Sequence, residues 1–168
     1  VCTFGDASAN HSTATGAFNA AGWVAYQRVP APVLFVCEDN GIGISVRTPT
    51  GWTAAAHAAD PRLPYFLADG LDLADTYDVT SEAADFVRRT GRPAFLHVRT
   101  VRLLGHAGSD VEQTYRSREE IEAAEALDPL RATAALLVEQ GWLSPGEVLT
   151  LHVRTVRLLG HAGSDVEQ

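Results

Sequence analysis

Two polar turns follow short apolar runs, and their side chains are of the types that bind a metal ion. Asp6 lies in the turn at residues 5–8, directly after the apolar run 1–4, and Asn40 follows the apolar run 33–37. Backbone N–H groups at the beginning of a helix favour phosphate oxygens, but a carboxylate there would repel them unless Mg²⁺ or Ca²⁺ lay between. The pair therefore predicts a metal–diphosphate site, with the Asn40 side chain and a nearby backbone carbonyl as further ligands.

Each turn taken alone also has an ordinary structural interpretation. Asp6 would then be a carboxylate at the beginning of a helix, and Asn40-Gly41 a tight turn. Two such turns at the ends of consecutive strands favour the metal site, because ligands of α/β proteins bind at the carboxyl ends of the strands.

The elements that must position these turns alternate between strand-like and helix-like patterns. The apolar spacing predicts strands at 1–4, 33–37, 65–67 and 94–103, and helices at 10–28, 52–59, 81–90 and 128–140. Ser81 is the expected N-cap of the third helix, and a further helix begins at Ser144. Because strands that alternate with helices pair in parallel, we predict an α/β fold, a three-layer sandwich with a mainly parallel sheet.

The composition is typical of a globular protein and excludes several functions. The 168 residues are 46% apolar and 20% charged, and 21 acidic against 13 basic residues give a net charge of −8. This balance argues against a nucleic-acid binder, and no apolar run approaches the roughly 18 to 20 residues that cross a membrane. With no export signal, we expect a cytoplasmic protein. The absence of Met favours a piece of a longer chain.

Two further features of the sequence lie outside the polar turns. Cys2 and Cys37 sit in apolar runs without metal-ligand spacing, so we expect both to be buried. Residues 151–168 repeat residues 96–113 letter for letter. Because repeat architectures show degenerate similarity over several units, a single exact copy indicates a tail without function.

The tail leaves one domain at residues 1–150. Within the copy we expect a helix followed by a frayed end, although pairing with the sheet edge of a neighbouring chain is the alternative. The helix would place four apolar side chains on one side: Leu151, Val153, Val156 and Leu159.

Several motifs together resemble the alpha subunit of the 2-oxo acid dehydrogenase E1 components. GDASAN, followed after one helix by VLFVCEDNGIGIS, resembles the thiamine diphosphate motif of that family, which opens with Gly-Asp-Gly and closes with Asn-Asn. LADGLD resembles its Asp-Gly-Asn-Asp turn, and RPAFLHVRTVRLLGHAGSDVEQTYRSREEI resembles its cofactor-loop segment. The likeness covers about residues 1–143. It implies an N-terminally truncated thiamine diphosphate-binding fold with thiamine diphosphate and Mg²⁺ as cofactors.

The resemblance assigns roles residue by residue. Asp6 and Asn40 would ligate Mg²⁺ through their side chains and Ile42 through its carbonyl. Arg102 would offer a positive fork to the phosphates, and His106 would act as a catalytic residue near the reacting centre. The diphosphate would be lined by Gly5, Ala7 and Ser8.

The same resemblance gives the cofactor loop its own set of residues. Its closed shape would be held by Ser109, Asp110, Tyr115 and Arg116, although for Tyr115 and Arg116 ordinary loop packing is an equal alternative. Two departures concern the metal motif, because Ala7 replaces the second Gly and Asp39 the first Asn. Leu104 stands where many members have His, and Ala107 where regulated members have a phosphorylated Ser.

The implied reaction is oxidative decarboxylation of a 2-oxo acid, with acyl transfer to lipoamide on an E2 component. The family's Glu that contacts the pyrimidine ring comes from the E1 beta subunit or a fused pyrimidine-binding domain, which nothing in this chain resembles. We therefore expect a dimer or higher oligomer with that partner, and no turnover by this chain alone. The alternatives are another thiamine diphosphate enzyme, transketolase-like or a decarboxylase, and a non-catalytic interaction fragment.

Overall fold

The computed structural model describes residues 1–152, and the chain divides into two compact units, Val1–Pro129 and Leu130–Gln168. The strands of the first unit are β1 (Cys2–Gly5), β2 (Leu34–Asp39), β3 (Tyr65–Asp69) and β4 (Ala94–Arg99). Its helices are α1 (Asp6–Ala9), α2 (Ser12–Tyr26), α3 (Trp52–His57), α4 (Leu73–Thr90), the 3₁₀ helix η1 (Glu112–Thr114) and α5 (Arg118–Ala126). Helix α6 (Pro129–Glu139) follows.

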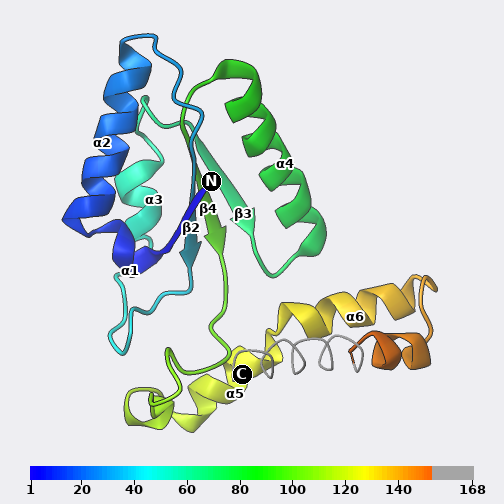
Figure 1. Ribbon diagram of the computed structural model, residues 1–168. Coiled ribbons are helices and arrows are strands. Elements are labelled where there is room, and N and C mark those ends of the chain that lie inside the picture. The colour runs from blue at the N-terminus through cyan, green and yellow to red at the C-terminus, as the bar shows by residue number, and fades with distance from the viewer. Residues whose placement is uncertain (153–168) are drawn as a thin grey trace, which may run out of the picture. The chain divides into compact units, whose positions relative to one another are not determined.

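The four strands form one parallel sheet in the order β1-β2-β4-β3 (Figure 1). Its register aligns Gly5 with Glu38 on the first pair of strands, and Asp39 with Arg99 on the second. The carboxyl ends of neighbouring strands therefore meet at one edge of the sheet, as the sequence predicted. The α/β class with a parallel sheet is confirmed.

Helices cover both faces of the sheet, which gives the predicted three layers (Figure 1). Helix α4 packs on one face against an aliphatic cluster that includes Leu34, Leu96 and Val98. The helices α1, α2 and α3 lie on the other face, where Phe18 meets Phe35 and the core is aromatic.

Several predicted boundaries are wrong. Helix α4 begins at Leu73, because the carboxylate of Asp72 accepts hydrogen bonds from two free N–H groups of its first turn. The expected cap Ser81 lies inside that helix. Helix α1 (Asp6–Ala9) begins inside the turn predicted at residues 5–8, and the strand predicted to reach residue 103 ends at Arg99. Helix α5 was not predicted.

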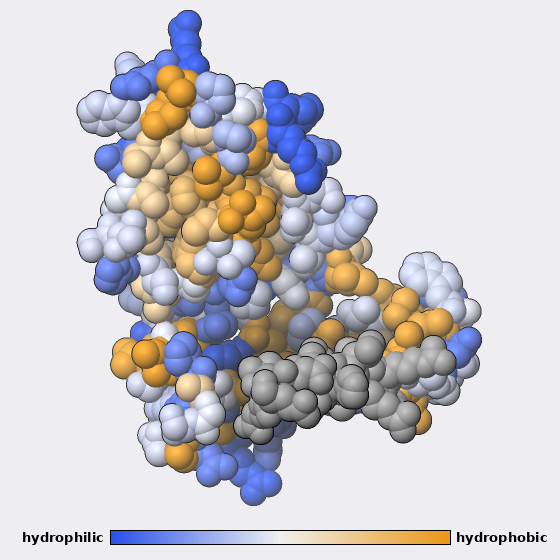
Figure 2. Space-filling view, viewed as in Figure 1, coloured by the Kyte–Doolittle hydropathy of each residue, from blue (hydrophilic) through white to orange (hydrophobic). Residues whose placement is uncertain are grey.

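The two cysteines have different environments. Cys37 is fully buried, as expected, but Cys2 is exposed. The reason is topological, because β1 is an edge strand of the described sheet and one side of it carries no neighbouring strand. Figure 2 shows apolar side chains gathered in the middle of the view, where β1 crosses in front of the sheet in Figure 1.

The second unit is helical within the described residues. The helix predicted at 128–140 is observed as α6, and Gly141, with a φ of +70°, follows its end. Ser144 and Glu147 exchange hydrogen bonds in a capping box, which begins the expected helix at residues 145–152. The predicted positions Val153, Val156 and Leu159 lie outside the described residues. No helix within residues 1–152 is both long and apolar enough to span a membrane.

Candidate functional site

Asp6 is a buried carboxylate at the carboxyl end of β1. Its exposure is 2%, and the Thr48 hydroxyl donates a hydrogen bond to Oδ2. No ion pair between described residues includes Asp6. Because a buried charge is costly without a counter-charge, the position fits a bound cation.

The segment after β2 folds into a compact turn that leads back toward Asp6. The Asn40 Oδ1 accepts a hydrogen bond from the N–H of Ile42 at 3.1 Å, and Gly41 adopts a φ of +74° that favours glycine. The N–H of Thr48 then donates to the Gly41 carbonyl at 3.1 Å. Thr48 therefore joins the predicted ligand turn to Asp6, through its backbone on one side and its hydroxyl on the other.

Gly43 brings the same loop close to helix α1. A Cβ atom added at Gly43 would lie 3.3 Å from the Cβ of Ala7, which is tighter than nearly all real contacts of this kind. The loop after β2 thus lies against the first turn after β1. This closeness brings the two predicted parts of the site, around Asp6 and around Asn40, into one place.

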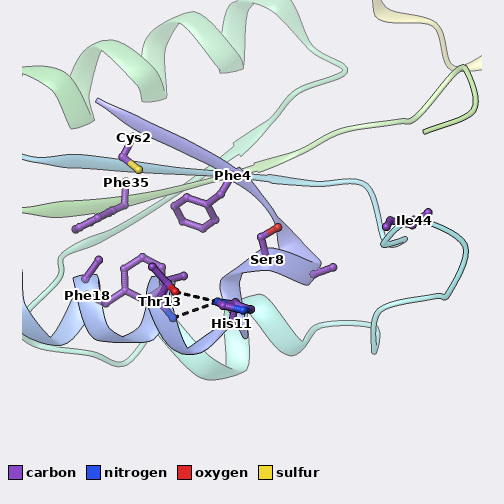
Figure 3. A pocket seen from close by; sticks show the side chains of 11 residues that line it. Cys2, Phe4, Ser8, His11, Thr13, Phe18, Phe35 and Ile44 are labelled. Atoms are coloured by element: carbon purple, nitrogen blue, oxygen red, sulfur yellow. Dashed lines mark hydrogen bonds between the residues drawn. The ribbon is translucent and has the colours of Figure 1, made fainter. Parts of the chain in front are cut away.

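The residues predicted to line a diphosphate have mixed surroundings. Gly5 ends β1 and precedes Asp6, whereas Ala7 and Ser8 line an apolar cavity of about 620 Å³ beside β1, into which Figure 3 looks. Phe4 and Phe18 line the same cavity. Ala7 and Ser8 are both exposed and thus accessible to a ligand.

Arg102 ties the cofactor-loop segment to the loop after β2. One guanidinium nitrogen donates to the carbonyls of Gly43 and Ile44, at 2.7 and 3.1 Å, and another donates to the Tyr115 hydroxyl at 2.8 Å. The guanidinium also lies 5.6 Å from the centre of the Tyr115 ring. The predicted phosphate ligand is therefore occupied with loop carbonyls here, next to the predicted metal turn.

A second set of hydrogen bonds closes the segment around Asp110. Its Oδ2 accepts from the backbone N–H of His106 at 2.7 Å and from the Tyr115 hydroxyl at 2.5 Å. These two bonds lower the pKa of Asp110, and the bond to Asp110 raises the pKa of Tyr115. The side chains of His106 and Ser109 are exposed, so only the backbone of His106 joins this network.

Arg116 is the buried anchor of the segment. It pairs with Glu112 and donates to the carbonyls of Arg102, at 3.2 Å, and Glu120, at 3.0 Å. Glu120 in turn caps α5 through Ser117. The structure thus brings together three of the four residues predicted to hold this loop, namely Asp110, Tyr115 and Arg116.

Two residues of the site region were missed from the sequence. Thr48 links Asp6 to the Asn40 turn, and His97 in β4 binds the side chain of Asp39 at 2.9 Å. Thr48 gave no signal, because it lies in a loop whose course the sequence does not fix. His97 did give one, since it interrupts the apolar strand 94–98 and a buried polar side chain needs a partner.

The side chains available near Asp6 limit the kind of metal centre that could form there. No group of three or more His, Cys, Asp or Glu side chains within residues 1–152 could hold an ion. A closed all-protein cage is therefore not supplied by this region. One carboxylate, one amide and one carbonyl suit Mg²⁺, which commonly keeps waters and completes its shell with phosphate oxygens.

The parallel sheet with oxygen donors at the ends of two adjacent strands defines an α/β protein with a ligand site at its carboxyl edge. The family model described as "Dehydrogenase E1 component" matches residues 1–167, and the chain belongs to this family. The match extends beyond residues 1–143, over which the sequence motifs run.

Curated relatives agree with the family. The chain is 31% identical to the 2-oxoisovalerate dehydrogenase subunit alpha of Bacillus subtilis, over 98% of this chain and 49% of the relative. It is 36% identical to the pyruvate dehydrogenase E1 component subunit alpha of Zymomonas mobilis, over 76% of this chain and 35% of the relative. The chain thus spans half or less of the length of these relatives. The relation to E1 alpha subunits expected from the motifs is confirmed.

Proposed function

We propose that this chain forms the Mg²⁺- and diphosphate-binding part of a thiamine diphosphate-dependent 2-oxo acid dehydrogenase E1. The observation that carries the proposal is the buried Asp6 carboxylate, which lacks a cationic partner among the described residues and is joined to the Asn40 turn through Thr48. The whole enzyme would decarboxylate a 2-oxo acid oxidatively and pass the acyl group to lipoamide of an E2 component. Both pyruvate and 2-oxoisovalerate are named among the relatives, so the acid stays open between these classes.

In this proposal, different residues of the chain would bind the metal ion and the diphosphate. Asp6, Asn40 and the carbonyl of Ile42 would hold Mg²⁺, whose charge would compensate the buried carboxylate and attract the diphosphate. The diphosphate would be contacted by Gly5, Ala7 and Ser8.

Arg102 and His106 belong to the proposed site through the loop that follows β4. Arg102 lies beside the metal turn and would exchange a loop carbonyl for a phosphate oxygen. The exposed His106 side chain would face the reacting end of the cofactor once that loop covers it, and would hold or deliver a proton there. When bound, thiamine diphosphate would supply the nucleophilic carbon that decarboxylation of a 2-oxo acid needs.

The proposal includes a division between chains. The group that contacts the cofactor's pyrimidine ring would come from an E1 beta subunit or a fused pyrimidine-binding domain, in a dimer or higher oligomer. We therefore expect this chain to bind the cofactor's diphosphate end weakly and to show no turnover by itself. Turnover should appear only with that partner, and acyl transfer only with a lipoyl E2 component.

The test is calorimetric titration of thiamine diphosphate into the 168-residue chain, with and without Mg²⁺. We expect Mg²⁺-dependent binding that Asp6→Asn weakens by more than about 100-fold, beyond the usual effect of losing an outer-shell partner. Asp69→Asn is the matched control, because Asp69 ends β3, on the far side of the sheet from β1. Absence of Mg²⁺-dependent binding by the folded wild type would favour the alternative, a non-catalytic interaction fragment.

A further inference from the structure

A chain of hydrogen-bonded side chains crosses three strands next to the proposed cation turn. The Tyr65 hydroxyl of β3 lies 2.5 Å from Nδ1 of His97 in β4, and Nε2 of His97 lies 2.9 Å from Oδ2 of Asp39 in β2. The His97 side chain is only 5% exposed and that of Asp39 is 21% exposed. These three side chains therefore form one polar line inside the core layer.

The chemistry of the groups gives the line a direction. A carboxylate accepts hydrogen bonds, so Nε2 of His97 donates to Asp39, and in the neutral ring Nδ1 accepts from the Tyr65 hydroxyl. The second oxygen of Asp39 accepts from the N–H of Gly41 at 3.0 Å. Both carboxylate oxygens of Asp39 thus have a fixed donor, which fixes the plane of the carboxylate.

We propose that His97 is a positioning residue for the cation turn. By orienting Asp39, it holds the N–H of Gly41, and with it the backbone between the two predicted ligands Asn40 and Ile42. The Gly41 carbonyl in turn accepts from Thr48, whose hydroxyl reaches Asp6. This inference rests on the proposed function, because it assigns His97 a purpose at the Mg²⁺ site.

Asp39 departs from the resembled motif, and His97 is the residue that hydrogen-bonds to it. Asp39 stands where that motif has its first Asn, and His97 supplies the donor that a carboxylate needs in a half-buried position. A carboxylate accepts from His97 and from Gly41 at the same time, one bond on each oxygen. Asp39 and His97 therefore act as a pair.

The competing interpretation is that His97 only fills the core, and His57 provides the comparison. His57 lies on the same face of the sheet, stacks on Phe95 at 4.4 Å between ring centres, and meets Phe18 edge to face at 5.2 Å. Burial lowers the pKa of His57, as expected for an imidazole in an aromatic environment. If both histidines were only packing groups, their replacement by Leu would have the same consequences.

The first experiment needs no cofactor and measures amide hydrogen exchange of the ¹⁵N-labelled 168-residue chain by NMR. We expect His97→Leu to accelerate exchange at Gly41 by about five- to tenfold. Without His97 to orient the Asp39 carboxylate, the hydrogen bond from the Gly41 N–H to Asp39 is weakened. His97→Gln, whose amide can donate to Asp39, should restore most of the protection. His57→Leu should leave Gly41 unchanged. Tyr65→Phe removes a single hydroxyl and gives a smaller change in the same direction, which serves if His97→Leu does not fold.

The second experiment measures the Mg²⁺ concentration at half-saturation of thiamine diphosphate binding. His97→Leu should raise it about 10- to 100-fold, as is usual for partners that orient a metal ligand, and His97→Gln should bring it back toward wild type. Unchanged exchange at Gly41 in both His97→Leu and Tyr65→Phe would overturn the positioning role. Faster exchange with an unchanged Mg²⁺ requirement would overturn its link to the cation. A folded wild type without Mg²⁺-dependent binding would instead overturn the proposed function, while the exchange data still decide whether His97 holds Asp39.

Discussion

The two faces of the sheet are built from the same strands but carry different chemistry. The buried core of the face under α4 is mainly aliphatic, as Leu96 and Val98 illustrate. The opposite face is aromatic at Phe95 and becomes polar toward the carboxyl ends, with His97 and Asp39. Because successive residues of a strand point to opposite faces, one strand supplies dry packing on one side and a polar network on the other. Alternate residues of β4 therefore supply the apolar packing under α4 and the polar network that we propose to position the cation turn.

Among the substitutions that compare the two faces, Leu96→Ala is expected to have the largest effect on stability. Leu96 is 1% exposed and packs under α4, so its truncation should lower the free energy of unfolding by about 2–5 kcal/mol. Urea unfolding followed by circular dichroism measures this loss. The Mg²⁺ requirement of the folded fraction should not change. If Leu96→Ala raised the Mg²⁺ requirement, the packing under α4 and the polar network on the opposite face would be energetically coupled. The two faces would then not have separate roles.

A smaller, local effect is expected from Arg102→Lys. The guanidinium reaches Gly43, Ile44 and Tyr115 at once, whereas a single ammonium cannot span the three acceptors. We expect the loop at 101–116 to be cut faster by thermolysin, with a loss of about 1–2 kcal/mol in unfolding free energy.

Arg99→Lys is the matched control for that experiment. Arg99 is the last residue of β4, three positions before Arg102. It forms only an exposed ion pair with Asp69 at 3.4 Å, a contact that contributes little to the free energy of unfolding. Equal cleavage of both variants would show that Arg102 does not tether the loop.

The sequence was sufficient for features that depend on local pattern. The order of strands and helices follows from apolar periodicity, and parallel pairing follows from their alternation. Asp6 and Asn40 could be assigned to neighbouring positions because each directly follows a strand. The register of the sheet then brings those strand ends together.

Other features depend on partners that are distant in the sequence and could not be read from local pattern. The exposure of Cys2 is decided by the edge position of β1 in the strand order, which a run of apolar letters does not contain. The His97–Asp39 bond joins residues of two strands, and the Thr48–Asp6 bond joins a loop to a strand end. The early beginning of α4 was missed for a different reason, because the prediction placed the N-cap at Ser81 and not at Asp72.

The smallest effect is expected for the chemical labelling of Cys37. This experiment probes solvent access to the polar face without a substitution on that face. Burial, followed by the negative charges of Asp39 and Asp6, raises the pKa of Cys37 to about 12, although a hydrogen bond with Thr53 opposes this shift. Because the thiolate is the reactive form, Cys37 stays a neutral thiol from pH 7 to pH 10 and should not react with iodoacetamide. The exposed Cys2 should react under the same conditions.

Peptide mass spectrometry after labelling at pH 8 and pH 10 measures both sites separately. Native protein should carry one label, on Cys2, and Cys2→Ser should carry none until guanidinium unfolds the chain and exposes Cys37. Raising the pH within this range should leave Cys37 unlabelled, since its thiolate forms only as the pH approaches its raised pKa. Native labelling of Cys37 at a rate close to that of Cys2 would mean that the face around Asp6 and Asp39 opens to solvent. The polar network would then be a mobile surface, and the contrast with the face under α4 would lie in dynamics as well as in chemistry.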